Sequence, residues 1–199
     1  MNIGRGAGDV QWMTAGGGII HQEMPELRPE ALRGFQLWVN LPSGQKMMSP
    51  RYRDIRSGDI PEVSSLSGAT IKVIAGRYRG VVGPARDIVI EPSYLDVTLP
   101  KGGLFEEDVP SGNTVFAHVV SGLGLFGPGG QAVSSGNAVL FRDGTRLQIG
   151  AGEEGLRFLV VSGRPLGEPV AWRGPIVMNT QDELDRAFED YRNGTFLRP

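Results

Sequence analysis

The stretch "GDVQWMTAGGGIIHQEMPE", residues 8–26, combines a strand-forming run, a glycine cluster and a histidine-glutamate pair. Residues 10–13 are mostly apolar, a composition that predicts a β-strand. Gly16, Gly17 and Gly18 predict a tight turn, because glycine adopts backbone conformations that other residues avoid. Residues 18–23 predict a second strand. The stretch therefore indicates a chain that folds through short strands joined by turns.

Glycine and proline also separate short runs of residues in the rest of the sequence. The 199 residues include 30 glycines and 14 prolines, which separate short β-prone runs rather than forming a low-complexity tract. Such spacing is typical of a barrel or sandwich, so the sequence predicts a mostly β fold. The predicted strands cover residues 10–13, 18–23, 34–41, 70–75, 88–90, 94–99, 114–121, 138–141, 146–149 and 156–162.

The C-terminus changes to helical character. Thr180 lies three residues before Glu183, which is the spacing of a capping box. Four apolar residues then follow the helical period and form one stripe: Leu184, Ala187, Phe188 and Tyr191. Gly194 predicts the end of the helix. We expect one C-terminal α-helix that packs on the β structure.

Charge and cysteine content exclude several functions. The formal net charge is -2 and the sequence has no basic stripe, which argues against a nucleic-acid partner. Arg51, Arg53 and Arg56 alternate with other residue types, which indicates a solvated surface. The absence of cysteine rules out disulfides, thiolate metal sites and cysteine nucleophiles. No apolar run reaches the ~20 residues of a membrane span and no signal-peptide pattern opens the sequence, so we expect a cytoplasmic location and no membrane contact.

His21 and Glu23 form a candidate metal pair. Residues i and i+2 of a strand project from the same face, so the imidazole and the carboxylate would lie side by side. These groups suit iron(II) or a similar divalent ion, although a tight site needs more than two donors. The alternative is a surface histidine beside a solvated glutamate. His118, the other histidine, lies in the apolar run "TVFAHVVSG", which favours a hydrogen-bonded histidine of the core or rim over a ligand.

Two parts of the sequence resemble each other. The stretches "LRGFQLWVNLP" at 32–42 and "GLRFLVVSGRP" at 155–165 each place an apolar run before a proline. A glycine-led run precedes each of them, "GDVQWM" at 8–13 and "GNAVLF" at 136–141. This weak repeat favours a duplicated β-domain. Only the first copy carries the His-x-Glu pair.

Several stretches together resemble the pirin family, in the same order and at matching places. They are "GDVQWMTAGGGIIHQEMPE" (8–26), "FQLWVNLP" (35–42), "PRYRDI" (50–55), "GPARDI" (83–88) and "GEPVAWRGPIVMNTQDELDRAFEDYRNGTF" (167–196). The resemblance implies tandem double-stranded β-helix (cupin) barrels with the metal site in the first. It implies the following division: residues 1–55 as the C-terminal part of the N-terminal cupin domain, 56–175 as the C-terminal cupin domain with its linker, and 176–199 as the C-terminal helix and tail.

The resemblance also implies a partial metal site. His21 and Glu23 correspond to two of four ligands of Fe(2+) or another divalent metal, and Glu23 would also act as the catalytic base. The other two family ligands are histidines of an H-x-H motif, which this sequence does not contain. We therefore expect an N-terminally truncated pirin, from a mis-assigned start or a true truncation, with an incomplete first barrel.

The implied activity is quercetin 2,3-dioxygenase-type oxygenation of flavonols, impaired here because two ligands are absent. The alternative is a non-enzymatic, iron-binding regulatory pirin whose partner is another protein. A third alternative is a degenerate remnant whose open sheet edges favour dimerisation or aggregation. None of these alternatives requires direct contact with nucleic acid.

Overall fold

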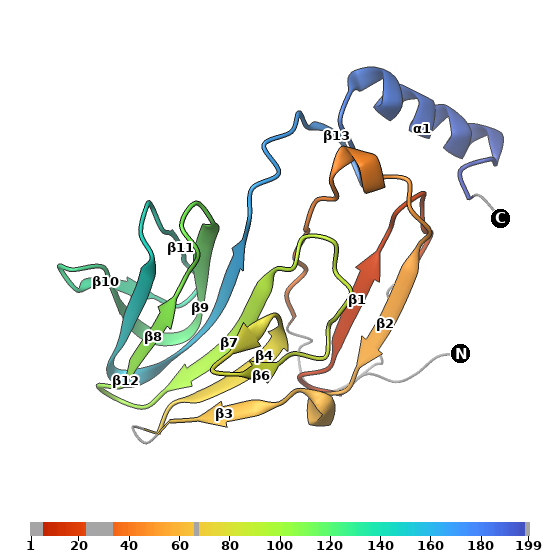
Figure 1. Ribbon diagram of the computed structural model, residues 1–199. Coiled ribbons are helices and arrows are strands. Elements are labelled where there is room, and N and C mark those ends of the chain that lie inside the picture. Colours follow the sequence, from red (N-terminus) through yellow and green to blue (C-terminus); the bar gives the residue numbers. More distant parts are fainter. Residues whose placement is uncertain (1–5, 23–33, 66–67, 198–199) are drawn as a thin grey trace. The chain divides into compact units, whose positions relative to one another are not determined.

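The chain divides into two compact units. The computed structural model describes residues 6–22, 34–65 and 68–197. One unit combines both ends of the chain, Met1–Asp54 with Leu166–Pro199, and the other is the middle of the chain, Ile55–Pro165. These units are defined by compactness, whereas the cupin domain boundaries expected near residues 55 and 175 stay a prediction. Figure 1 shows the elements in chain order.

The middle unit is built on one eight-stranded sheet. Its strands are β3 (Glu62–Ser64), β4 (Thr70–Ala75), β7 (Ser93–Leu99), β8 (Leu104–Asp108), β9 (Thr114–Phe126), β10 (Gln131–Ser134), β11 (Ala138–Leu140) and β12 (Arg146–Gly163). The pairings form an open path, β10-β9-β12-β7-β4-β3, with β11 added on β9 and β8 on β12. A small hairpin joins β5 (Arg77–Tyr78) and β6 (Val81–Val82), and a short 3-10 helix covers Ser57–Asp59.

Strand β12 is the longest element of this sheet and pairs with three other strands. It pairs antiparallel with β7, β8 and β9, and its register against β9 shifts between Ala151 and Leu156. Gly122 and Gly155 lie at this shift with positive φ angles of 80° and 74°. A Cβ on Gly122 would collide with the carbonyl oxygen of Gly155. The two predicted strands at 146–149 and 156–162 are therefore one strand with a glycine bulge, because glycine permits the close backbone approach.

The core of the middle unit is apolar and centred on stacked aromatic rings. Phe105 lies with its ring centroid 5.8 Å from Tyr78 in a stacked pair and 5.6 Å from Phe158 in an edge-on pair. All three side chains are fully buried. Alternating residues of the neighbouring strands, such as Val97 and Val119, fill the space around the rings. Offset and edge-on aromatic contacts of this kind add to the free energy of burial.

The unit made of the chain ends contains smaller pieces of secondary structure. Strands β1 (Val10–Thr14) and β2 (Arg51–Ile55) form one two-stranded sheet and run in opposite directions in Figure 1. Strands β13 (Ala171–Arg173) and β14 (Ile176–Met178) form another, and α1 (Gln181–Asn193) follows. A short 3-10 helix covers Ser43–Gln45.

A buried lysine links the two chain ends within this unit. Lys46 is 6% exposed, and its Nζ donates a hydrogen bond to Asn40 Oδ1 at 2.6 Å. Burial lowers the pKa of Lys46, while the carboxylates of Glu168 and Glu183 raise it. The Glu168 carboxylate also accepts from the backbone N–H of Ser43 at 2.7 Å. Residues 40–46 are thereby joined to the C-terminal segment by charge and by hydrogen bonds.

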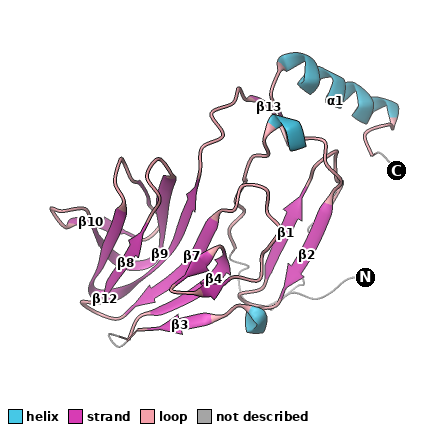
Figure 2. Ribbon diagram, viewed as in Figure 1, coloured by secondary structure: helices cyan, strands magenta, loops and turns pink. Residues whose placement is uncertain are grey.

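The structure confirms the predicted mostly β fold with one C-terminal helix (Figure 2). It places strands at 10–14, 70–75, 93–99 and 138–140, close to the predicted positions. The predicted strands at 34–41 and 88–90 are wrong, since these residues form irregular chain and a turn, and the described part of 18–23 is irregular as well. An alternating pattern makes a strand only where a neighbouring strand supplies a hydrogen-bonded ladder, and none of the described strands pairs with 34–41.

Helix α1 confirms the predicted capping box. The Thr180 side chain accepts from the Glu183 backbone N–H, and the Glu183 carboxylate accepts from the Thr180 N–H at 2.9 Å. That backbone bond is the main reason the pKa of Glu183 is lowered. Gly194 ends the helix in the left-handed conformation, and Leu184 is buried. No helix in the described ranges combines the length and apolar character needed to cross a bilayer.

We predict that Thr180→Ala lowers the free energy of unfolding by about 1 kcal/mol, because the helix loses one side of its cap. Chemical denaturation followed by circular dichroism measures the change. Arg186→Ala, on an exposed position of the same helix, is the control and leaves stability nearly unchanged. Equal effects of the two substitutions would contradict the prediction.

Truncating the aromatic core has a larger expected effect. Phe158→Ala removes a fully buried ring and leaves a cavity beside Phe105, so we predict a loss of about 3–5 kcal/mol in unfolding free energy. Leu140→Ala, at a side chain that is 69% exposed, is the matched control. Denaturant titration of both variants checks the difference, and a loss below about 1 kcal/mol for Phe158→Ala would contradict it.

Candidate functional site

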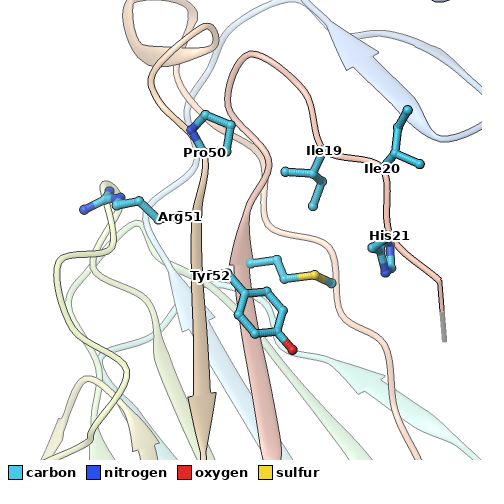
Figure 3. A pocket seen from close by; sticks show the side chains of 7 residues that line it. Ile19, Ile20, His21, Pro50, Arg51 and Tyr52 are labelled. Atoms are coloured by element: carbon cyan, nitrogen blue, oxygen red, sulfur yellow. The ribbon is translucent and has the colours of Figure 1, made fainter. Parts of the chain in front are cut away.

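A shallow pocket in the unit of chain ends contains the candidate histidine. The pocket has a volume of about 210 Å³ and is shown from close by in Figure 3. It lies between the chain that follows β1 and the beginning of β2. The residues that line it are Met13, Ile19, Ile20, His21, Pro50, Arg51 and Tyr52.

The glycine turn after β1 brings these two segments together. The Gly18 N–H donates to the Ala15 carbonyl at 2.9 Å, and Gly16 has a positive φ of 50°, which confirms the predicted tight turn. The Gly17 N–H donates to the carbonyl oxygen of Met48, also at 2.9 Å. A Cβ on Gly16 would collide with that same oxygen. Only glycine allows this approach, which sets residues 19–21 beside residues 50–52.

Strand β2 presents Tyr52 to the pocket. Figure 3 shows the Tyr52 ring extending toward the segment of Ile19 and His21, whereas Arg51 points to the opposite side. The Tyr52 hydroxyl accepts from Gln11 Nε2 and donates to Asp54 Oδ1 at 2.9 Å. These partners fix the phenol although the side chain is 55% exposed. Tyr52 is not predicted from the sequence, because the arginines on either side of it indicate a solvated surface; the alternation of residues 51–55 is the signal for a strand.

His21 is exposed and lies in irregular chain. Glu23, the expected second ligand and base, lies outside the described residues, so the pairing of the two side chains stays a prediction. Among the residues that the structure describes, no three His, Cys, Asp or Glu side chains come close enough to hold a metal ion. The described residues therefore do not by themselves fit the metal site implied by the resemblance, and His21 is the single imidazole at the pocket.

The second histidine belongs to the middle unit. His118 lies on β9, opposite Ala138 on one side and Leu159 on the other. Its side chain is partly buried. A position inside a sheet, between paired strands, agrees with the expectation of a structural histidine.

A second, polar pocket lies on the middle unit. It is lined by Arg79, Glu106, Glu107, Asp108 and Arg146. Glu106 accepts from the Arg146 guanidinium at 2.9 Å, which leaves the two groups paired. Glu107 lies on the same face of β8 as the buried Phe105. Burial raises the pKa of Glu107 and the charge of Asp108 raises it further, while Arg79 lowers it.

Comparison with known protein families gives two matches. The family described as "Pirin C-terminal cupin domain" matches residues 94–197. The family described as "Pirin" matches residues 3–39. Together these matches cover the second half of the chain and the region of the pocket turn.

Curated relatives match nearly the whole chain. Pirin-1 of Arabidopsis thaliana is 44% identical over 191 residues, which are 94% of this chain and 65% of the relative. A pirin-like protein of Caulobacter vibrioides is 40% identical over 200 residues, which are 98% of this chain and 71% of the relative. The chain therefore spans about two thirds of the length of these relatives.

Solved structures share the fold. A crystal structure named as a quercetin 2,3-dioxygenase from Acinetobacter baumannii matches with a TM-score of 0.85 and 34% identity. The match covers 96% of this chain and 68% of that chain. It supports the predicted cupin architecture.

We predict that Glu107→Gln stabilises the protein at neutral pH by less than about 1 kcal/mol, because the partly solvated carboxylate no longer has to be charged near the core. A raised pKa means that the folded state binds the proton more tightly than the unfolded state does. The stability that protonated Glu107 contributes is therefore present below pH 4.5 and is lost as the pH rises through the folded pKa. Thermal unfolding at pH 4 and pH 7 checks the sign. The gain should vanish at the lower pH, and the exposed Glu154→Gln control should show no gain at either; a gain that persists in acid would contradict the explanation.

Proposed function

Because the chain belongs to the pirin family, we propose that it serves in quercetin 2,3-dioxygenase-type oxygenation of flavonols, with His21 and Glu23 as donors to Fe(2+) or another divalent metal. The supporting observation is the pocket at His21. Of its lining residues, Met13, Ile19, Ile20 and His21 lie within residues 3–39, which match the pirin family. The name of the similar Acinetobacter baumannii structure supports the substrate class.

The lining of the pocket suits one face of a flat aromatic ligand. Met13 and Ile19 offer apolar surface, and Tyr52 adds a fixed phenol. Its volume of about 210 Å³ is below the ~300–1,000 Å³ of usual small-molecule sites. The described residues therefore form part of a flavonol site rather than the whole of one.

The proposed donor set is small. The sequence has two histidines, and His118 lies on a sheet strand of the other unit. One imidazole and one carboxylate fall short of the three protein donors that hold non-haem iron(II). We therefore expect this chain alone to hold a metal weakly.

We predict that the purified chain, dialysed against Fe(2+) under anaerobic conditions and then desalted, keeps well below one iron per chain. Elemental analysis measures the ratio. The weak binding expected in equilibrium dialysis should be lost in His21→Ala and kept in His118→Gln. One tightly held iron per chain, or binding that survives His21→Ala, would overturn this donor assignment.

Turnover is tested in a chimaera that supplies the part absent from this chain. The segment of the Acinetobacter baumannii protein with no counterpart here is fused to the chain, and oxygen uptake is measured with quercetin and Fe(2+). His21→Ala and Glu23→Gln should each reduce uptake by more than the ~10–100-fold expected when a group that only orients a metal ligand is changed. His118→Gln should retain it. Quercetin turnover that persists in His21→Ala would refute the proposed role.

The second candidate function is a non-enzymatic, iron-binding role with a protein partner. Trp38 and Trp172 are 56% and 69% exposed, and their ring centroids lie 6.3 Å apart. Exposed aromatic residues are enriched at protein interfaces, which favours this alternative. Iron binding by the chimaera without quercetin-dependent oxygen uptake would support the partner role over the enzyme.

A further inference from the structure

The C-terminal segment of the chain contacts the glycine turn that precedes His21. Gly18 has a φ of 130°, and a Cβ placed on it would lie 2.8 Å from Cε1 and 3.1 Å from Cζ of the Phe196 ring. The ring therefore lies directly against the Gly18 backbone. Gly18 is followed by Ile19, Ile20 and His21, which line the pocket.

Phe196 is itself held in place by the end of α1. The Tyr191 ring packs edge-on against it with centroids 5.9 Å apart. Gly194 turns the chain with a positive φ of 73°, and the Thr195 N–H donates to the Asp190 carbonyl at 2.9 Å. The helix cap therefore fixes the direction in which the ring projects.

The pocket turn is thus held at two points. The Met48 carbonyl accepts from Gly17 on one side, and the Phe196 ring covers Gly18 on the other. After Gly18, residues 19–22 have no regular secondary structure. The position of His21 consequently depends on how firmly the turn before it is held, since no strand ladder holds residues 19–22 themselves.

We propose that Phe196 is a positioning residue for His21. Its ring covers Gly18 and holds the segment 19–21 against β2, so that the C-terminal end of the chain shapes the pocket at the N-terminal end. The use of His21 as a metal donor rests on the proposed function, but the positioning itself does not.

Histidine NMR tests the proposal without metal or substrate. The full chain is labelled with isotope on histidine only, and its two imidazoles give two sets of signals, assigned with His21→Ala and His118→Gln. In Phe196→Ala, the His21 signals should move to the positions of an unstructured histidine and sharpen. The His118 signals should stay in place and report that the other unit remains folded.

A second variant disturbs the same contact from the opposite side. Gly18→Ala places a methyl group against the Phe196 ring at a φ of 130°, which also strains any residue with a side chain, and both effects should displace the His21 signals; Phe196→Ala leaves this backbone position unchanged and therefore tests the ring contact by itself. Gly17→Ala is its matched control, because a Cβ there meets only ordinary contacts at 3.7 Å and 3.8 Å. Leu197→Ala, at a side chain that is 52% exposed, is the control for Phe196→Ala.

The outcomes separate the proposal from a general effect on stability. His21 signals that move in Phe196→Ala and Gly18→Ala but not in the controls support it. Unchanged His21 signals in Phe196→Ala would overturn it, as would equal displacement of the His21 and His118 signals, which would mean that Phe196 stabilises the whole chain. A failure of quercetin oxygenation in the chimaera leaves this result unaffected.

Discussion

The burial of Lys46 among partners from both ends of the chain is the constraint on which the candidate site depends. A charged lysine that is 6% exposed is costly unless hydrogen-bond acceptors and negative charges surround its ammonium group. Asn40 supplies the acceptor, and Glu168 and Glu183 supply the charge. Among the described residues, the sheets of this unit have two strands each, which is marginal for independent stability, so contacts between the chain ends help to hold the unit together.

The shape of the pocket depends on contacts between the two ends of the chain. The turn at Gly16 to Gly18 lies against Met48, two residues after Lys46, and against Phe196 in the C-terminal segment. Neither contact comes from a regular sheet or helix ladder. The segment of His21 therefore owes its position to single contacts from residues distant in the sequence.

Local features were predictable from the sequence, and features that need a distant partner were not. The cap formed by Thr180, Glu183 and Gly194 depends on residues within one helix, and the structure contains it as expected. Residues 34–41 alternate as a strand does, but a strand also needs a neighbour, and no spacing rule reveals whether one is present. The joining of 146–149 to 156–162 in β12 was missed because glycine marks a bulge as readily as a turn. His21 could be identified from its residue type, whereas the role of Tyr52 depends on hydrogen bonds to Gln11 and Asp54 that only the fold creates.

The division of the chain has a consequence for its biosynthesis. Every strand of the middle unit lies within residues 55–165, so that unit can fold as soon as β12 has left the ribosome. Residues 6–54 emerge earlier, but their partners in 166–197 are translated only after the middle unit. Residues 6–54 must therefore remain without these contacts until the whole middle unit has been translated.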